Sequence, residues 1–263
     1  MSLDLSIIMP SFNQVAFLEE AVRSVLDQDG VAVELLVMDP GSTDGSRELL
    51  ERLAVEYGER LVLHFSPDTG QSDAVNKGMA LARGNVLGWL NSDDRLRPGA
   101  LEKAVQLLDK ADPAWLYGRA GVIDAEGRPM SPIIVRYKNW RGRRFSRQKL
   151  LTDNFIPQMA VFWNRAMWQQ AGGLDPVKEL DMDYDLWLKF SRLAEPTVLT
   201  VDLADFRVHG AAKGSRLTGA QLDAAYETAR HHAAGLGCAG QWALILHRLF
   251  GWRTRILYWW MKP

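Results

Sequence analysis

The stretch Val86-Leu87-Gly88-Trp89-Leu90-Asn91-Ser92-Asp93-Asp94 ends an apolar run in two adjacent carboxylates. Interpreted as a buried strand, it brings Asp93 and Asp94 to the carboxyl end of a sheet, where open α/β sheets bind their ligands. Oxygen ligands of this kind suit Mg²⁺ or Mn²⁺, especially a cation shared with substrate phosphates. On this stretch alone a polar turn is the better interpretation, with Asp94 capping a helix that begins near Pro98. The rest of the sequence is needed to distinguish a polar turn from a ligand-binding site.

Around this stretch, short apolar runs alternate with helical patterns. We predict strands at 5–10, 33–38, 61–65 and 86–90, and helices at 15–28, 47–57, 70–81 and 100–108. Such nearly continuous apolar strands are typical of a parallel sheet covered on both faces. Right-handed crossovers bring the strand ends to one rim of the sheet. That rim carries Asn13, Asp39, Asp73 and the pair at 93–94.

After residue 113 the pattern changes. We predict strands at 114–117, 121–124, 158–163 and 197–201, and helices at 165–170, from 181 onward, at 220–236 and at 241–262. The stretch 136–149 is rich in Arg, Lys and aromatic residues and is predicted to be a loop. It is either a solvated loop or a mobile loop near a phosphate or a charged lipid surface.

Composition limits the function classes. The 263 residues are 47% hydrophobic, which is enough for a sizeable core, and 31 Lys+Arg against 32 Asp+Glu argue against nucleic acid as a partner. The single cysteine, Cys238, excludes an internal disulfide and fits a reducing compartment. The first residues show no basic segment followed by a long apolar run, so we expect no signal peptide.

The last predicted helix, 241–262, interleaves Trp, Leu, Ile and Phe with basic residues. Its arginines make it a poor membrane-spanning helix. Arg248, Arg255 and Lys262 recur every seven residues, which suits a helix lying in a membrane interface, whereas Arg253 falls near the apolar side. Docking on the core explains the same helix, and the sequence leaves both interpretations open.

Seven motifs resemble, in order and spacing, those of the family 2 glycosyltransferases, which are inverting enzymes of the GT-A fold with nucleotide-sugar donors. They are Met9-Pro10-Ser11-Phe12-Asn13, Met38-Asp39-Pro40-Gly41-Ser42-Thr43-Asp44-Gly45-Ser46, Gly70-Gln71-Ser72-Asp73-Ala74-Val75-Asn76-Lys77-Gly78, Leu90-Asn91-Ser92-Asp93-Asp94, Gly172-Gly173, Met182-Asp183-Tyr184-Asp185-Leu186-Trp187 and Arg207-Val208-His209. Together they cover residues 5–210. The chain is most similar to the bacterial subgroup that builds O-antigen, capsule and other exopolysaccharides.

The resemblance implies an α/β chain with a Rossmann-like, mostly parallel sheet flanked by helices and a C-terminal helical extension. We expect a GT-A domain at 1–215, with a nucleotide-binding half at 1–112 and an acceptor half at 113–215, and a helical segment at 216–263. It implies transfer of a sugar from a nucleotide-sugar donor to a hydroxyl of a glycan or lipid-linked acceptor in cell-surface polysaccharide synthesis. We expect a cytoplasmic protein that contacts the inner face of the plasma membrane peripherally.

By the same resemblance, Pro10, Phe12 and Asn13 line the base pocket, and Asp39 hydrogen-bonds the base or ribose. Asp73 either faces the sugar or ribose or caps a helix.

Asp94 is expected to ligate Mg²⁺ or Mn²⁺, and Asp93 to contact ribose or sugar hydroxyls. His209 either completes the metal shell or is a surface histidine at a strand end. The cation neutralises charge on the leaving nucleoside diphosphate. Lys213 and Arg216 lie in a Gly-flanked loop that either closes over the diphosphate or is a solvated linker.

Asp183 matches the proposed general base, which takes the proton of the attacking acceptor hydroxyl. Family members usually have an acid just before this aspartate, whereas Met182 stands there in this chain, so Asp181 and Asp185 remain alternatives for the base. Gln158 is expected to face the acceptor.

Two other functions fit parts of the sequence. A nucleotidyltransferase would want a Gly-rich, Lys-bearing phosphate loop after the first strand, where this chain has Ser11-Phe12-Asn13-Gln14. A non-catalytic nucleotide-sugar or glycan-binding domain of the same fold predicts losses at the chemical positions. The chain retains Asp39, Asp93, Asp94, Asp183 and His209.

Overall fold

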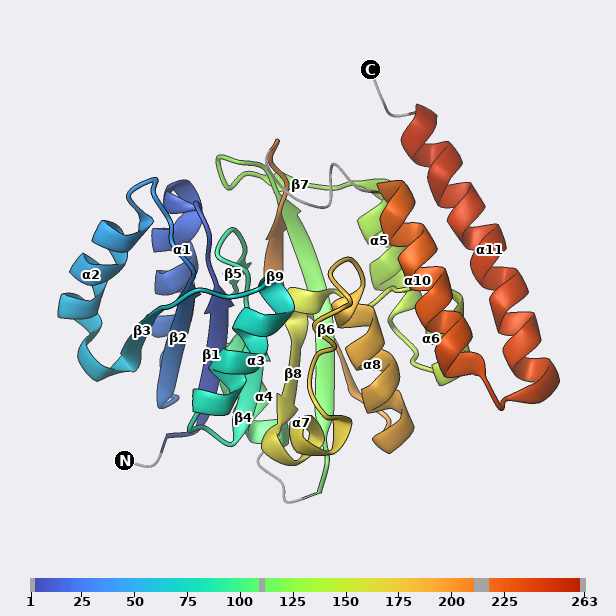
Figure 1. Cartoon of the computed structure of the whole chain (residues 1–263), viewed down its shortest axis with the longest axis horizontal. Coiled ribbons are helices and arrows are strands. Elements are labelled where there is room, and N and C mark those ends of the chain that lie inside the picture. Colours follow the sequence, from blue (N-terminus) through green and yellow to red (C-terminus); the bar gives the residue numbers. More distant parts are fainter. Residues whose placement is uncertain (1–2, 109–111, 211–217, 261–263) are drawn as a thin grey trace.

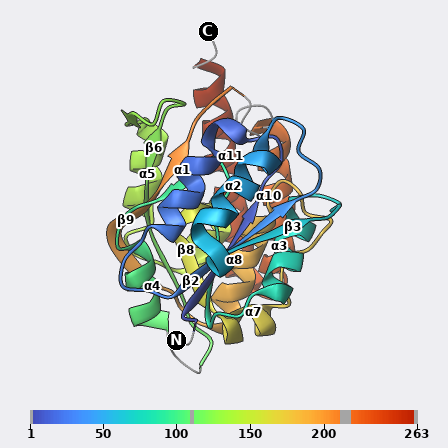
Figure 2. The same ribbon diagram turned by 90° about the vertical axis from the view of Figure 1, so that its left-hand side faces the viewer.

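A computed structural model describes residues 3–108, 112–210 and 218–260, with the side chains of the last helix described as far as residue 251. One curled nine-stranded sheet runs through the molecule, and helices cover both of its faces (Figures 1 and 2). The predicted α/β architecture is confirmed.

The described chain contains these elements. The strands are β1 (Leu5–Pro10), β2 (Val33–Asp39), β3 (Leu61–Phe65), β4 (Val86–Trp89), β5 (Arg95–Leu96), β6 (Trp115–Ile123), β7 (Pro129–Met130), β8 (Val161–Asn164) and β9 (Thr197–Arg207). The helices are α1 (Val15–Leu26), α2 (Ser46–Tyr57), α3 (Gln71–Leu81), α4 (Ala100–Leu108), α5 (Ile133–Arg141), α6 (Arg147–Thr152), α7 (Arg165–Ala171), α8 (Met182–Leu193), α10 (Thr218–Ala233) and α11 (Gly237–Trp260). Two short 3₁₀ turns are η1 (Gly58–Arg60) and η2 (Gln158–Ala160).

The strand order is β3-β2-β1-β4-β8-β6-β9-β5, with β7 paired to β6. β1 runs parallel to both β2 and β4, and β2 runs parallel to β3, so the first half is the predicted Rossmann-like sheet. β8 is antiparallel to β4 and joins the second half to the same sheet. β5 follows β4 closely in the chain, yet it pairs with β9 at the far edge of the sheet.

Each face of the sheet has its own core, because successive strand residues point to opposite faces. In β1, Leu5, Ile7 and Met9 pack with α1, α2 and α4, whereas Ile8 packs with α3 on the other side. Figure 2 shows α3 and α4 on opposite sides of the sheet. The second core holds the stacked Trp115 and Trp187, whose ring centroids are 6.1 Å apart.

Four predictions about the second half are corrected. Residues 115–123 form one strand rather than two, and β9 continues to Arg207 because it pairs with β6 along this whole length, across two register shifts. Residues 158–160 form a 3₁₀ turn before β8 begins. The basic stretch 136–149, predicted to be a loop, forms most of α5 and the start of α6.

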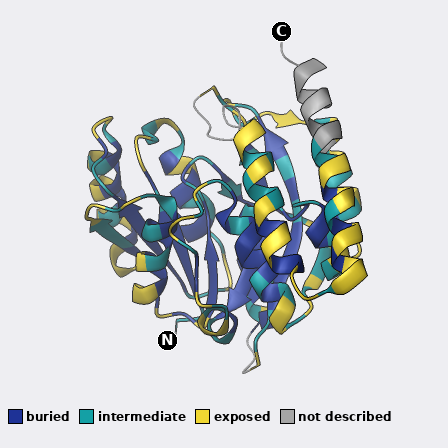
Figure 3. Ribbon diagram, turned by 45° about the vertical axis from the view of Figure 1, so that its right-hand side comes forward, coloured by how far each residue is buried: buried dark blue, intermediate teal, exposed yellow. Residues whose placement is uncertain are grey.

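The C-terminal helices dock on the core at the α6 and α8 side (Figure 1). The buried His247 in α11 donates from Nδ1 to the carbonyl of Leu151 at 3.0 Å, and Arg141 lies over the ring of Phe250 at 4.9 Å. The outward face of α11 is exposed (Figure 3) and includes Trp242 at 66% and Leu249 at 54% exposure. Among the described residues, none of the helices is both long and apolar enough to cross a membrane.

Candidate functional site

A cleft of ≈ 640 Å³ lies at the carboxyl ends of β1, β2 and β4, beside the end of β9. It is lined by Pro10, Ser11, Phe12, Gln14, Met38, Pro40, Asp68, Gly70, Gln71, Ala74, Asn91, Ser92, Asp93 and Phe206. Residues from five separate segments of the chain meet here, which is the rim that the strand–helix alternation predicts. Phe12 is 57% exposed, so a flat aromatic face is available at the edge of the cleft.

Asn13 joins the first two loops of this rim. It adopts a left-handed backbone conformation with φ 53°, which asparagine tolerates better than most residues. Its N–H donates to Ser42 Oγ at 2.8 Å, and its Oδ1 accepts from the N–H of Thr43 at 2.9 Å. Pro10 and Phe12 line the cleft as expected, whereas the exposed Asn13 is not among the residues that line it and braces the two loops instead.

Asp39 ends β2 and is fully buried. Its Oδ1 accepts from the N–H groups of Gly41 and Ser42 at 2.9 and 2.8 Å and from Arg47 Nε at 3.0 Å. Burial alone raises the pKa of Asp39, but the hydrogen bonds from Ser42, Arg47 and Gly41 outweigh it and hold the pKa below its ordinary value. Within the described part of the chain, Asp39 Oδ2 is buried without a hydrogen-bond partner. The cleft therefore has an ionised acceptor between its lining residues Met38 and Pro40.

Asp93 and His209 meet at the next strand end. The Nε2 atom of His209 lies 3.1 Å from Asp93 Oδ2, although the two residues are far apart in sequence. Phe17 packs against the imidazole with a centroid distance of 4.6 Å and fixes the ring from the α1 side. An imidazole nitrogen and a carboxylate oxygen thus share one edge of the cleft.

Asp94 has different surroundings from those of its neighbour. It is 1% exposed, and its Oδ1 accepts from the backbone N–H of Arg207 at 2.9 Å. Burial and the adjacent Asp93 charge raise the pKa of Asp94 well above its ordinary value. The geometry therefore pairs His209 with Asp93 and uses Asp94 to tie the 91–94 turn to the end of β9. The expected roles of Asp94 as the metal ligand and of Asp93 as a ribose or sugar contact stay predictions.

Arg207 fixes the ends of three segments, a role that the motif Arg207-Val208-His209 did not reveal from sequence alone. The residue is 1% exposed, and its Nε donates to the carbonyl of Asp93 at 2.8 Å. It also donates to the carbonyl of Asp124 at 3.1 Å, forms an ion pair with Glu20 in α1 and lies over the ring of Phe17 at 5.0 Å. One buried guanidinium thus joins α1, the 93–94 turn and the turn after β6.

A chain of amides closes the floor of the cleft. Asn91 accepts from Gln71 Nε2 at 2.7 Å and donates to Gln158 Oε1 at 3.3 Å. Gln158 Nε2 donates in turn to the carbonyl of Trp89 at 2.8 Å. Gln158 is half-buried and holds the end of β4, and its expected contact with an acceptor remains a prediction.

Asp73 and Asp68, near the start of α3, have different contacts. Asp73 pairs with Lys77 at 2.8 Å and accepts from the N–H of Thr69 at 2.9 Å. It lies in the first turn of α3, whose N-cap is Gly70 rather than Asp73, and its expected contact with the sugar or ribose stays a prediction. Asp68 lines the cleft and accepts from the N–H of Gly70 at 3.0 Å. The sequence interpretation missed Asp68, although a carboxylate directly before the Gly70 turn was a signal that could have found it.

Asp183 lies in the first turn of α8, on the acceptor half of the sheet. Its Oδ2 accepts from Asn154 Nδ2 at 3.2 Å, and its Oδ1 accepts from the N–H of Tyr184 at 2.7 Å. Burial raises the pKa of Asp183 above its ordinary value. A half-buried carboxylate with a raised pKa and an amide that orients it has the properties of a general base.

The two alternative acids differ from Asp183. Asp185 is buried, its side chain bonds Lys189 and His232 at 2.9 Å each, and these partners lower its pKa to about 2. This engagement makes Asp185 a structural ion pair rather than a base. Asp181 is 5% exposed, with a buried Oδ2 that has no hydrogen-bond partner among the described residues.

The start of α8 is held against the start of α3, which borders the cleft. Ser72 Oγ lies 2.9 Å from Met182 Sδ. Met182, where the family usually has an acid, is 7% exposed and fills this junction. Lys213, proposed to cover the diphosphate, lies outside the described residues, as does Arg216.

Comparisons with known proteins agree with this geometry. A sequence model described as "Glycosyl transferase family 2" matches residues 6–170. An uncharacterized glycosyltransferase of Nostoc sp. is 27% identical over 215 residues, which are 79% of this chain and 65% of that protein. Chondroitin synthase of Pasteurella multocida is 31% identical over 193 residues, which are 72% of this chain and 19% of that protein. The chain thus spans just under two thirds of the first relative and about a fifth of the second.

Solved structures give the same fold. A mannosyltransferase from Pyrobaculum calidifontis, in complex with GDP-Man and Mn²⁺, superposes with a TM-score of 0.66 at 18% sequence identity. The superposition covers 93% of this chain and 73% of that one. At this identity the likeness bears on the fold alone.

Proposed function

The chain belongs to the family 2 glycosyltransferases and has their GT-A fold, and from this we propose that it transfers a sugar from a nucleotide-sugar donor to a hydroxyl of a glycan or lipid-linked acceptor, with inversion. The observation that carries the proposal is one cleft lined both by Met38 and Pro40, the neighbours of Asp39, and by Asp93, which contacts His209. Asp183, on the adjoining α8, completes the set of reactive groups. A role in surface polysaccharide synthesis is part of the proposal, and the similarity to a chondroitin synthase supports it.

The nucleoside end of the donor binds between the first two loops. The ionised Asp39 has a free oxygen, which suits an N–H of the base or a ribose hydroxyl. Phe12 offers an exposed ring on which a base stacks. The bracing of these loops through Asn13 keeps the pocket formed before the donor arrives.

Asp93 and His209 fit a divalent cation better than Asp94 does. Asp93 lines the cleft and its carboxylate oxygen suits Mg²⁺ or Mn²⁺, whereas Asp94 is 1% exposed and accepts a backbone hydrogen bond. A cation would replace the direct contact of 3.1 Å between Asp93 and His209. No set of three or more His, Cys, Asp or Glu side chains gathers around one point among the described residues. Two protein ligands suit an ion that keeps water and donor phosphates in its shell. When bound, such an ion neutralises charge on the leaving diphosphate.

The protein's own groups carry out the remaining work. Asp183 takes the proton from the acceptor hydroxyl as that oxygen attacks the anomeric carbon, and Asn154 orients the carboxylate. Arg207 holds the carbonyl of Asp93 and so fixes the direction of its side chain. Asp73, Asp68 and Gln158 support the sugar-facing wall.

A thermal-shift screen of nucleoside diphosphates and their sugars, with and without Mn²⁺, tests donor binding. Only a ligand that binds the native state stabilises it, and a ligand at a hundred times its Kd adds about 2.7 kcal/mol. We therefore expect one nucleotide series to raise the Tm by about 5–10 °C in the presence of metal. A screen in which all nucleotides leave the Tm unchanged would contradict the proposal. Product analysis with the stabilising donor then identifies the sugar transferred.

We also propose a peripheral contact of α11 with the inner face of the plasma membrane. Its inner face is docked through His247, so the exposed Trp242, Ile245, Leu246 and Leu249 form an outward apolar stripe. Docking on the core is therefore the observed role of one face, and the membrane contact of the other face is the proposal.

The double variant Trp242→Gln/Leu249→Gln should reduce sedimentation with liposomes containing phosphatidylglycerol by about tenfold or more, since each apolar side chain loses burial in the lipid. Val55→Gln, at an 88% exposed position on α2, is the matched control and should sediment like the parent protein. Equal sedimentation of all three proteins would make the outward face of α11 irrelevant to membranes.

A further inference from the structure

A second hollow, of ≈ 680 Å³, lies away from the cleft, between α5, β6 and β9. Arg119 from β6, Arg136 from α5 and Arg143 from the α5–α6 turn line it, with Asp202 of β9 and the indole of Trp140. Three guanidinium groups therefore face one carboxylate. The nucleotide-sugar function described above uses none of these residues.

The carboxylate is already shared between two arginines. Asp202 Oδ1 accepts from Arg119 Nε at 2.9 Å, and its Oδ2 accepts from Arg97 NH1 at 3.1 Å. In the part of the chain that the structure describes, the guanidinium groups of Arg136 and Arg143 have no ion pair or side-chain hydrogen bond. The hollow thus keeps an excess of positive charge without a protein partner.

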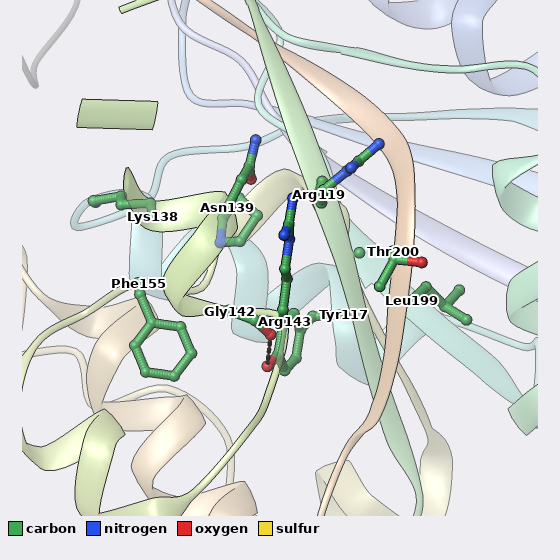
Figure 4. Close-up of a pocket in the computed structure, with 11 residues that line it drawn as sticks. Tyr117, Arg119, Lys138, Asn139, Gly142, Arg143, Phe155, Leu199 and Thr200 are labelled. Atoms are coloured by element: carbon green, nitrogen blue, oxygen red, sulfur yellow. Dashed lines mark hydrogen bonds between the residues drawn. The ribbon is translucent and has the colours of Figure 1, made fainter. Parts of the chain in front are cut away.

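More positive groups surround the hollow. Arg119 and Arg143 also line an adjoining pocket with Lys138 (Figure 4). On the far side of Arg143, burial and the nearby Arg141 and Arg144 charges lower the pKa of Lys149. Cations that are far apart on a solvated surface repel each other little. Cations that surround one hollow repel each other more, and an anion bound between them lowers their electrostatic free energy.

The hollow also has an aromatic wall. Trp140 is 60% exposed, and its ring centroid lies 6.3 Å from that of Tyr137. A broad aromatic face next to guanidinium groups suits a ligand that has both an apolar or sugar portion and an anionic one.

The hollow lies in the acceptor half of the molecule, near the proposed base Asp183. Lys138, on the same helix, acts on the Asp183 carboxylate electrostatically. Phe155 and Pro157 line the adjoining pocket, and Asn154, directly before them, holds Asp183. The hollow is therefore next to the proposed base and separate from the residues that line the donor cleft.

We propose that the hollow lined by Arg119, Arg136, Arg143 and Trp140 is an anion subsite that binds a diphosphate group carried by the acceptor. This inference rests on the proposed transferase function and extends it to the class of acceptor. Three guanidinium groups less one carboxylate leave two positive charges, which match the two negative charges of a diphosphate diester better than the one charge of a carboxylate. Guanidinium groups bind phosphate oxygens bidentately and so also orient the group.

P1-geranyl P2-methyl diphosphate, called geranyl diphosphate below, is a suitable probe, because it has the two charges of a diphosphate diester and an apolar chain but no nucleoside. Binding is measured by calorimetry in EDTA, which removes any metal-dependent binding at the donor cleft. The variant Arg136→Gln/Arg143→Gln should bind at least about tenfold more weakly, since the hydrogen bonds of two charged groups to the anion are lost. The variant Arg52→Gln/Arg230→Gln removes two exposed guanidinium groups elsewhere and should bind like the parent protein.

Kinetics gives the second readout. For an acceptor sugar with a diphosphate aglycone, the Arg136/Arg143 variant should show a raised KM with little change in kcat, whereas the same sugar with a neutral aglycone should be unaffected. Equal binding and equal KM in the variant and the parent would overturn the subsite. Glycerol phosphate binding as tightly as geranyl diphosphate would overturn the assignment to a diphosphate. If all donors fail to give transfer, the proposed function fails, while the EDTA binding result still decides whether the anion site exists.

Discussion

Replacing Asp183 with Asn is expected to lower kcat by about 10²–10⁴-fold, the usual contribution of a positioned general base. The amide keeps the shape of the side chain and one oxygen toward Asn154, but it cannot accept the proton of the acceptor hydroxyl. Donor binding should be unchanged, because Asp183 is not among the residues that line the donor cleft.

The measurement is the rate of transfer at saturating donor and acceptor, with the nucleotide-induced Tm shift as the check on donor binding. Asp29→Asn is the matched control, since Asp29 is exposed in the loop between α1 and β2. Unimpaired turnover of the Asp183 variant would remove it as the base. Asp181, with its unpartnered buried oxygen, would then be the next acid to test.

The pH profile gives an independent signature. Because burial raises the pKa of Asp183, the base becomes protonated at a higher pH than an ordinary aspartate, whose value is 3.8. Activity should therefore decline as the pH falls through an inflection above 3.8, and it should be full on the alkaline side of that inflection. The residual activity of the Asn variant should lack this inflection.

Replacing Asp93 with Ala is expected to reduce kcat/KM by about 10²-fold or more, because a bound cation contributes several kcal/mol of charge stabilisation. Asp94→Asn is the informative comparison. The side-chain amide oxygen introduced by this substitution can still accept from the N–H of Arg207, so the variant should keep metal-dependent donor binding.

Titration with Mn²⁺ in the presence of the stabilising donor separates the two carboxylates. The Asp93 variant should lose the extra Tm shift that metal adds, and the Asp94→Asn variant should retain it. The reverse result would restore the role that the sequence suggested, with Asp94 as the ligand.

The nucleotide half could be predicted from sequence because its strands are apolar and its helices are regular. The strands predicted at 5–10 and 61–65 match the structure residue for residue. The roles within the pair at 93–94 could not be predicted. They depend on Arg207 and His209, which follow more than a hundred residues later and act through tertiary contacts.

The α5–α6 region shows a second limit of prediction from the sequence. Basic residues are distributed around α5 without a clear apolar stripe, so periodicity alone favours a loop. The helix ends at contacts that no local pattern reveals, such as the hydrogen bond at 2.7 Å from the Tyr117 hydroxyl to the carbonyl of Gly142. Met182 is a similar case, because it contacts Ser72 of α3, a residue 110 positions away in the sequence.

The pairing of β5 with β9 has a consequence for the order of events at the ribosome. A nascent chain that stops before residue 197 already contains the nucleotide half and both carboxylates at 93–94, but it lacks the partner of β5. It also lacks Arg207, whose guanidinium holds the 93–94 turn to α1. Since N-terminal segments fold first during synthesis, the early product presents an unpaired strand edge and an unfinished site until β9 emerges. In this order of synthesis, the 93–94 turn gains its contact with Arg207 only after β9 has emerged.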